Sequence, residues 1–413
     1  MAFLVHGAVI ANWVPRVPAV KAALGTSDGP LGLAMLGLGV GAAAALLVAG
    51  RVVARFGSRP VVRAAGVAVC ASLAGPGLAG NLPLLAVTLG LVGATSGLLD
   101  VAMNAHGALV ERGYGRSIMA SLHGLWSVGG LLGAVTGGLA ARAGWSPARH
   151  FAVAALCLAA TVVVGTRRLL PAAADAAPAG PVPAEPVPAA AGAIPAEPVP
   201  GEPLPAAARA PLHGPGAPRE DGGTPGRGRG VPWSAPLLVL GVVGFSSFFG
   251  EGSAHDWSAI YLHDVLGTSA GTAAAGFAAF SLAMAAVRFA GDRLSARFGP
   301  VRLVRASGLV AATGFGLGLL AHQPLAGVAG FALLGAGLAC VVPVTFSAAG
   351  HLGGGPAGVA ISRVAAISYL ATFVGPPVIG LVADLTSLSV ALAIPVVLAG
   401  VVALCARAVA TAA

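Results

Sequence analysis

A succession of twelve apolar stretches, each long enough to form a membrane-spanning helix, limits the fold of this chain more than any other feature. Only 9% of the residues are charged and 57% are hydrophobic, whereas an ordinary soluble domain contains about 25% charged residues. A soluble protein of 413 residues cannot bury that much apolar surface. The sequence therefore predicts an all-α membrane protein with twelve transmembrane helices, and it excludes a water-soluble enzyme.

The expected spans follow one another closely, with one long interruption after the sixth. The apolar run of the first stretch, from Met1 to Val14, is short, so either its helix continues past Pro15 or Met1 is not the true start of the protein. The spans are expected at approximately residues 1–22, 31–53, 61–79, 83–108, 117–140, 150–168, 235–262, 270–292, 301–321, 324–347, 358–382 and 387–408.

The interruption, residues 171–232, is rich in proline, alanine and glycine and repeats the sequence Ala-Glu-Pro-Val-Pro at 184–188 and 196–200. Proline removes a backbone hydrogen-bond donor and favours extended conformations. We therefore expect a disordered or polyproline-like linker. The predicted organisation is an N-terminal six-helix half at residues 1–170, the linker, and a C-terminal six-helix half at residues 233–413.

Arginines gather in alternate loops, and this pattern predicts the orientation of the chain in the membrane. By the positive-inside rule, both termini and the linker are expected on the cytoplasmic side of the inner membrane. The formal net charge of +9 then reflects membrane topology, and no nucleic-acid partner is expected. The arginines that set this orientation are Arg51, Arg55, Arg59, Arg63, Arg112, Arg116, Arg167, Arg168, Arg293, Arg297, Arg302 and Arg305.

Two segments recur at the same distance along the chain. Residues 24–29 read LGTSDG and residues 266–271 read LGTSAG, an offset of 242. Residues 54–66 read ARFGSRPVVRAAG and residues 296–308 read ARFGPVRLVRASG, with eight of thirteen positions identical at the same offset. Two matches that share one offset predict a duplicated unit, and hence two pseudo-symmetric six-helix halves.

The arginine-rich turn after the second span of each half resembles the signature loop of the major facilitator superfamily, which reads roughly Gly-x-x-x-Asp-Arg-x-Gly-Arg-Arg. Gly50, Arg55, Gly57 and Arg59 match this pattern, but Ala54 stands where the family has an acid. The resemblance implies the major facilitator fold and a conformational gate at this turn. In the second half, the expected gate residues are Arg288, Asp292, Arg293, Arg297 and Gly299.

Four further segments are similar to the MosC-like group of this superfamily, which is linked to rhizopine, an inositol-type compound. They are WVPRVP at 13–18, LDVAMN at 99–104, HGLWSVGG at 123–130, and the segment from Glu251 to Ser258. Because substrates vary widely within one fold family, the resemblance implies a transporter of small solutes without naming the solute.

Ionisable groups inside membrane spans are costly and are therefore candidates for function. Asp100 and Asn104 lie four residues apart on one face of the fourth span, and His123 enters the fifth span at a similar depth. These three side chains are expected to meet. They would form either a proton-coupling or substrate-binding group, or a structural hydrogen-bond cluster.

The seventh span carries Ser247, Glu251 and His255 on one face, at spacings of four residues. A carboxylate at this depth must be paired or protonated. Glu251 is therefore expected to bind a proton or the substrate, or else to be a static partner of His255. Asp256, nearer the membrane surface, is a weaker candidate of the same kind.

Other polar residues have two interpretations each. Asn12 and Trp126 either line a central cavity or pack helices together. Arg288 either extends toward the membrane surface or forms a gate-side ion pair with Asp292, four residues later. Asp292 is also the residue expected to replace the acid that is missing at Ala54.

The predicted function is secondary active transport of a small organic solute by alternating access. Proton-coupled export is favoured, since Gly124, Gly133 and Gly137 follow the spacing of the superfamily's antiporter motif, although Gly138 replaces its proline. The alternatives are a proton-linked importer of a sugar or polyol, and a non-transporting sensor or scaffold that uses the linker. The expected partners are the lipid bilayer, the solute and protons, and a monomer suffices.

An enzymatic function is not expected. Two matches to the GxSxG nucleophile pattern, at 25–29 and 267–271, fall in loops between membrane helices, whereas that motif needs a strand before it and a helix after it. Ser27 and Ser269 are expected to be helix N-caps instead. No cofactor or metal is expected, because the chain has no HExxH or CxxC pattern.

Overall fold

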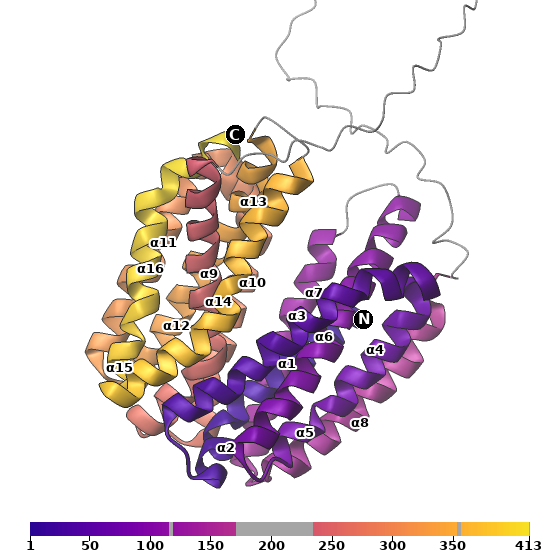
Figure 1. Cartoon of the computed structure of the whole chain (residues 1–413). Helices are drawn as coiled ribbons and strands as arrows, with labels where there is room; N and C mark the ends of the chain where they lie inside the picture. The colour runs from indigo at the N-terminus through magenta and orange to yellow at the C-terminus, as the bar shows by residue number, and fades with distance from the viewer. Residues whose placement is uncertain (115–118, 171–233, 353–356, 413) are drawn as a thin grey trace, which may run out of the picture. The chain divides into compact units, whose positions relative to one another are not determined.

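The computed structural model describes residues 1–114, 119–170, 234–352 and 357–412. These residues form helices and no β-strand, and they include twelve helical runs long and apolar enough to cross a membrane. Each run overlaps a stretch that hydropathy predicts. Figure 1 shows the helices that form these runs. The prediction of an all-α membrane protein with twelve spans is confirmed, while the expected linker at 171–232 lies outside the described residues.

The first half contains six spans. Its elements are α1 (Ala2–Trp13), η1 (Val14–Arg16), α2 (Val17–Leu24), α3 (Asp28–Phe56), α4 (Ser58–Ser72), α5 (Ala74–Gly77), α6 (Leu82–Tyr114), α7 (Met119–Arg142), α8 (Pro147–Gly165) and η2 (Thr166–Arg168). The first span turns from α-helix to a 3₁₀ turn at Pro15, because proline cannot donate the α-helical hydrogen bond. The span then resumes as α2, so the helix does continue past Pro15.

The second half repeats this plan. Its elements are α9 (Ala235–Ile260), the π-helical turn η5 (Tyr261–Val265), α10 (Ala270–Phe298), α11 (Pro300–Ala321), α12 (Pro324–Leu338), α13 (Val341–His351), α14 (Ala357–Leu385), α15 (Leu388–Ala391), α16 (Ala393–Leu404) and η6 (Cys405–Ala412). The seventh span is α9 with η5, and the tenth is α12 with α13.

The offset of 242 residues recurs in the helix boundaries. α3 and α10 differ by 242 at their first and at their last residue. Each ends at a glycine with positive φ, Gly57 at 82° and Gly299 at 74°, a conformation that residues with a Cβ rarely adopt. The internal repeat predicted from the sequence is therefore present as equivalent helices and turns.

Equivalent helices also pack in the same way within the two halves. In the first half, α3 packs along α6, α1 along α7, and α4 along α6 and α8. In the second half, α10 packs along α12, α9 along α14, and α11 along α12 and α16. When the twelve spans are numbered along the chain, each packed pair of the first half corresponds to the pair of the second half whose span numbers are higher by six. The two halves are therefore two copies of the same six-helix bundle, as the sequence repeat predicts.

The halves touch most extensively through two equivalent helix pairs, α3 with α14 and α7 with α10, while η1 and α2 also contact the second half. α3 and α10 are the second spans of their halves, and α7 and α14 are the fifth. Exchanging the halves therefore converts one pair into the other, as a pseudo-twofold relation requires. The first span of each half is interior: 83% of the apolar window of α1–α2 and 61% of that of α9–η5 is buried, against 22% for α8. Polar side chains on these two spans therefore face protein and not lipid.

Small residues allow the closest helix contacts. An added Cβ at Gly41 or Gly93 would overlap the backbone of the opposing helix in the α3–α6 pair, and one at Gly129 would overlap the backbone of α1. Close packing of this kind holds helices together in lipid, where the hydrophobic effect does not drive them to associate. Glycine at these seams is thus required by the fold.

Gly93→Leu is expected to destabilise the protein, because the new side chain must displace the backbone of α3 beside Leu38. Overpacking of this type costs about 1–3 kcal/mol, which thermal unfolding of the purified protein in detergent would detect. Gly400→Leu is the matched control, since no atom lies within 4 Å of an added Cβ at that position. Equal losses of stability in both variants would contradict the tight α3–α6 seam.

Candidate functional site

The polar face of α6 meets α7 where the sequence predicts. The Asn104 amide donates to the backbone oxygen of Asp100 at 2.9 Å and to its carboxylate Oδ1 at 3.2 Å. His123 Nε2 lies 3.2 Å from Asn104 Oδ1, and because an amide oxygen only accepts, the imidazole is the donor. Asp100, Asn104 and His123 thus form one hydrogen-bonded chain that begins at the carboxylate on α6 and ends on α7.

His6 joins three helices of the first half. The Trp126 indole N–H donates to His6 Nδ1 at 3.1 Å. Nε2 is then the nitrogen that carries the hydrogen in the neutral ring, and it lies 2.5 Å from Ser96 Oγ. His6 itself is buried. The N–H group of Trp126 is therefore used to pack α1, α6 and α7 together.

Asn12 makes similar contacts. Its amide donates to the Ala8 carbonyl at 2.7 Å, and its side-chain oxygen accepts from Thr136 on α7 at 3.4 Å. The residue is only 2% exposed. For both Asn12 and Trp126, these contacts match the packing interpretation, and a role in binding stays a prediction.

Glu251 is paired with an arginine from the next span. Its Oε2 lies 3.5 Å from an Arg288 guanidinium nitrogen, and its Oε1 accepts from Ser247 Oγ at 3.5 Å. Arg288 Nε also donates to the Ala339 carbonyl at 3.3 Å. The guanidinium therefore points into the second half and not toward the membrane surface. The side chain of Asp292, its expected partner, lies outside the described part of the chain.

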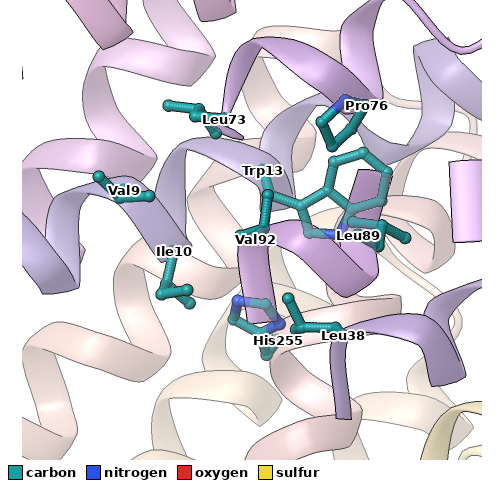
Figure 2. A pocket seen from close by; sticks show the side chains of 9 residues that line it. All are labelled: Val9, Ile10, Trp13, Leu38, Leu73, Pro76, Leu89, Val92 and His255. Atoms are coloured by element: carbon teal, nitrogen blue, oxygen red, sulfur yellow. The ribbon is translucent and has the colours of Figure 1, made fainter. Parts of the chain in front are cut away.

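His255 pairs with its neighbour Asp256 and not with Glu251. Its Nδ1 lies 2.8 Å from Asp256 Oδ1, while its Nε2 is buried and has no hydrogen-bond partner among the described residues. The ring lines a small pocket whose other walls are apolar side chains of the first half, among them Val9 and Trp13 (Figure 2). Glu251 and His255 share a helix, but they face different surroundings.

Tyr369 on α14 is a polar residue at the centre that the sequence analysis missed. Its ring packs against Phe248, with ring centroids 5.0 Å apart. Asp100 from the first half and Glu251 from the second both act electrostatically on its phenol. The phenol therefore marks the place where polar groups of the two halves face each other. The central polar cluster comprises Asp100, Asn104, His123, Ser247, Glu251, Arg288 and Tyr369.

The helical repeat of α14 explains the direction of Tyr369. Phe373, Pro376 and Gly380 form one stripe of this helix and pack against α3. Tyr369 stands four residues before Phe373 and so belongs to the same stripe, yet it is 47% exposed. Tyr369 therefore points toward the first half without being covered by it.

The two arginine turns have the same local geometry. The Arg55 guanidinium lies 5.5 Å from the Phe56 ring centroid, and the Arg297 guanidinium lies 5.4 Å from that of Phe298. These pairs are again 242 residues apart. A cation over an aromatic face is stabilised by the ring quadrupole, so both turns present their arginines in one fixed way.

The remaining gate residues are less alike. Arg59 donates to the Arg167 carbonyl at 3.4 Å, which ties the first turn to η2, the 3₁₀ turn that follows α8. Arg293 is exposed, and an added Cβ at Gly50 would meet no atom within 4 Å, so the present packing does not require glycine there. The gate function of these residues, and of Asp292, stays a prediction.

Lys21 bridges the two halves close to the repeated LGTS loops, residues 24–27 and 266–269. Its ammonium lies 2.6 Å from Asp28 and 2.8 Å from Asp264 of the second half. His263 Nδ1 lies 2.7 Å from the same Asp264 carboxylate. His263 follows Lys21 by 242 residues, so equivalent positions of the two halves contact one acid.

A second polar contact joins the halves at this end. Ser27 Oγ donates to Asp384 Oδ2 at 2.8 Å. Ser27 occupies the N-cap position of α3 without a side-chain capping bond, whereas Ser269 accepts from the Thr272 backbone N–H as the sequence predicts. The LGTS-end cluster comprises Lys21, Ser27, Asp28, His263, Asp264 and Asp384.

No group of three or more His, Cys, Asp or Glu side chains that could hold a metal ion occurs within the described residues. The polar chemistry described above consists instead of hydrogen bonds and ion pairs. Such a set can hold a small polar molecule or a proton between helices, and it can be broken and remade when helices move.

The sequence profile of the Major Facilitator Superfamily matches residues 1–355 and 243–412. The chain belongs to the Major Facilitator Superfamily, and it is a multi-pass membrane transporter of that family. The fold predicted from the signature turn is therefore confirmed.

Individual relatives cover almost the whole chain. An uncharacterized MFS-type transporter of Yersinia pestis is 34% identical over 419 residues, which cover 99% of this chain and 94% of the relative. The membrane protein MosC of Rhizobium meliloti is 29% identical over 405 residues, with 98% and 87% covered. The resemblance to the MosC-like group is confirmed.

Solved structures show the same fold at low sequence identity. The nucleoside transporter NupG superimposes with a TM-score of 0.66 at 10% identity, covering 99% of this chain and 96% of that one. A D-xylose-proton symporter superimposes with a TM-score of 0.67 at 14% identity, covering 98% and 94%. At these identities the likeness establishes the architecture alone.

Lys21 is the only lysine of the chain, so an amine-reactive ester reports on the LGTS-end cluster. Asp264→Asn is expected to raise the rate of Lys21 labelling several-fold, because the ammonium loses one of the two carboxylates that hold it. Peptide mass spectrometry after timed exposure separates Lys21 from the terminal amine. Asp256→Asn is the control, since Asp256 pairs with His255, and equal rates in wild type and Asp264→Asn would argue against the cross-half ion pair.

His6→Ala is expected to lower the free energy of unfolding by about 1–3 kcal/mol, because it leaves the Trp126 N–H and the Ser96 hydroxyl unpaired. Thermal unfolding in detergent measures the loss. The control is His322→Asn, at an exposed turn where φ is 50°, a value that Asn tolerates. A His6 variant as stable as the wild type would show that the three-helix contact contributes nothing.

Proposed function

We propose that the protein couples the movement of protons to the export of a small polar organic solute across the cytoplasmic membrane. The observation that supports this most is the central polar cluster, in which a carboxylate from each half acts electrostatically on the phenol of Tyr369. Ionisable groups at this depth are costly and mark solute and proton pathways in membrane proteins. Solute and proton would bind between the halves, which then rock around the site.

The distribution of arginines supports the orientation. The turns at Gly57 and Gly299, with their flanking arginines, lie on the cytoplasmic side if the positive-inside rule holds. The LGTS-end cluster then lies outside, and its ion pairs close the outer side in this conformation. A monomer suffices for this cycle, because both walls of the central polar cluster come from one chain.

Proton-linked import of a sugar or polyol is the second candidate, since a D-xylose-proton symporter shares the fold. The preference for export over import rests on the glycine spacing in α7, where Gly133 and Gly137 pack closely against the first span. Such packing is compatible with either direction, so the sign of the coupled proton movement decides between them. A scaffold function predicts instead that deletion of residues 175–230 abolishes activity.

Purified protein in liposomes loaded with a pH-sensitive dye tests the proposal. Xylose, inositol, nucleosides, amino acids and amphiphilic drugs are added one class at a time, with imposed proton gradients of either sign. Export by exchange predicts that solute and protons move in opposite directions, whereas import by symport predicts the same direction. Absence of any proton-linked flux, and of counterflow of the radiolabelled solutes, from folded protein would contradict transport of these classes.

Glu251→Gln is expected to lower proton-driven transport by roughly tenfold or more, because the loss of a charged hydrogen-bond partner costs about 1.5–3 kcal/mol and leaves Arg288 without its counter-ion. Initial rates in the same liposomes measure this effect. Glu185→Gln, in the linker segment outside the spans, is the matched control and is expected to transport at the wild-type rate. A fully active Glu251→Gln variant would remove Glu251 from the site.

A further inference from the structure

The central polar cluster contains one carboxylate from each half, but only one of them has a basic partner. Glu251 is paired with Arg288. Asp100 accepts a hydrogen bond from Asn104 at 3.2 Å, and no Lys, Arg or His nitrogen in the described part of the chain lies within ion-pair distance of it. An amide stabilises a carboxylate but does not neutralise its charge.

The groups that contact or face Asp100 do not supply a cation either, and Arg288 is held by Glu251. His123 directs its Nε2 to Asn104 Oδ1 and not to the carboxylate, and Tyr369 presents an uncharged phenol from the other half. The titratable or charged groups linked to Asp100 lie on α1, α7, α9, α10 and α14. Asp100 and Glu251 both act on Tyr369, while Arg288 acts on His123 and His123 acts on His6.

A carboxylate without a cation is strongly unfavourable between membrane helices, and such a group is neutralised instead. We propose that Asp100 takes up the transported proton, with the Tyr369 hydroxyl of the opposite half as its partner, while Glu251 remains paired with Arg288. This proposal rests on the proposed function, and it assigns the coupling step to Asp100 in place of Glu251.

The proton balance is simple. A proton from water on one side of the membrane binds to a carboxylate oxygen of Asp100, and the same O–H bond breaks when the proton passes to water on the other side. No electron moves and no co-reactant is needed. When the halves close over the cluster, a neutral carboxyl can be buried against the phenol, whereas an ionised one would be buried without a cation. Proton uptake therefore favours closure.

The test detects the proton bound to the carboxyl group directly, and it needs no solute. Infrared difference spectra of the full-length protein in liposomes, between neutral and alkaline pH, resolve the C=O stretch of a protonated carboxylic acid. We expect this band in the wild type and in Asp256→Asn, and its loss in Asp100→Asn. The Asn side chain keeps the shape of Asp100, and thermal unfolding verifies that the variant is folded.

Tyr369→Phe tests the partner separately. It removes only a hydroxyl, so the band is expected to remain but to shift in frequency, because the carboxyl loses a hydrogen-bonding group. Tyr261→Phe, at a buried tyrosine beyond the central polar cluster, is the matched control and should leave the frequency unchanged. An unshifted band in Tyr369→Phe would overturn the partnership.

Persistence of the band in folded Asp100→Asn, or its absence from the wild type, would overturn the proton assignment whatever the solute screen shows. Failure of the proposed function has a different signature. In that case the band depends on Asp100, yet no solute class drives proton movement or counterflow in liposomes.

Discussion

The structure depends on one constraint: within a bilayer, a polar group has no water to bind, so it must find its partner inside the protein. Among the described residues, the polar side chains of the spans make most of their hydrogen bonds and ion pairs within their own half, as the chain from Asp100 to His123 and the Glu251–Arg288 pair do. Within the described part of the chain, the polar contacts that cross between the halves lie in the LGTS-end cluster and in the central polar cluster. These are the contacts that must change when the halves move.

The duplicated scaffold carries polar groups that are not duplicated. At the offset of 242 residues, Glu251 corresponds to Val9, Arg288 to Leu46, and Asp100 to Val342. The helices, the glycine turns and the seams are equivalent in the two halves because packing in lipid requires them. The polar cluster is asymmetric, since one wall carries a balanced ion pair and the other a lone acid. In the proposed cycle, these two walls hold a proton and a solute by different groups.

Sequence reasoning succeeded where a contact depends on spacing within one helix or on depth in adjacent spans. The Asp100–Asn104–His123 chain is such a case, since α6 and α7 are consecutive and their depths follow from the rise per residue. It missed the pairing of Arg288 with Glu251, because Arg288 was expected at the membrane surface or beside Asp292. An arginine inside an apolar span is itself a signal to look for a buried carboxylate. Tyr369 gave no comparable signal, because tyrosine in a span is as often a surface anchor.

The sequence by itself determined the twelve spans, the repeat and the family, because hydropathy, proline positions and a constant offset are local or periodic properties of the chain. It also restricted the site to a few ionisable residues, since these are rare in apolar helices. Only the tertiary structure decided their partners. Whether Glu251 meets His255 or Arg288, and whether Tyr369 points toward lipid or toward the first half, depends on how each helix is rotated about its own axis. That rotation is set by the packing of glycine seams between spans distant in sequence, which no single helix encodes.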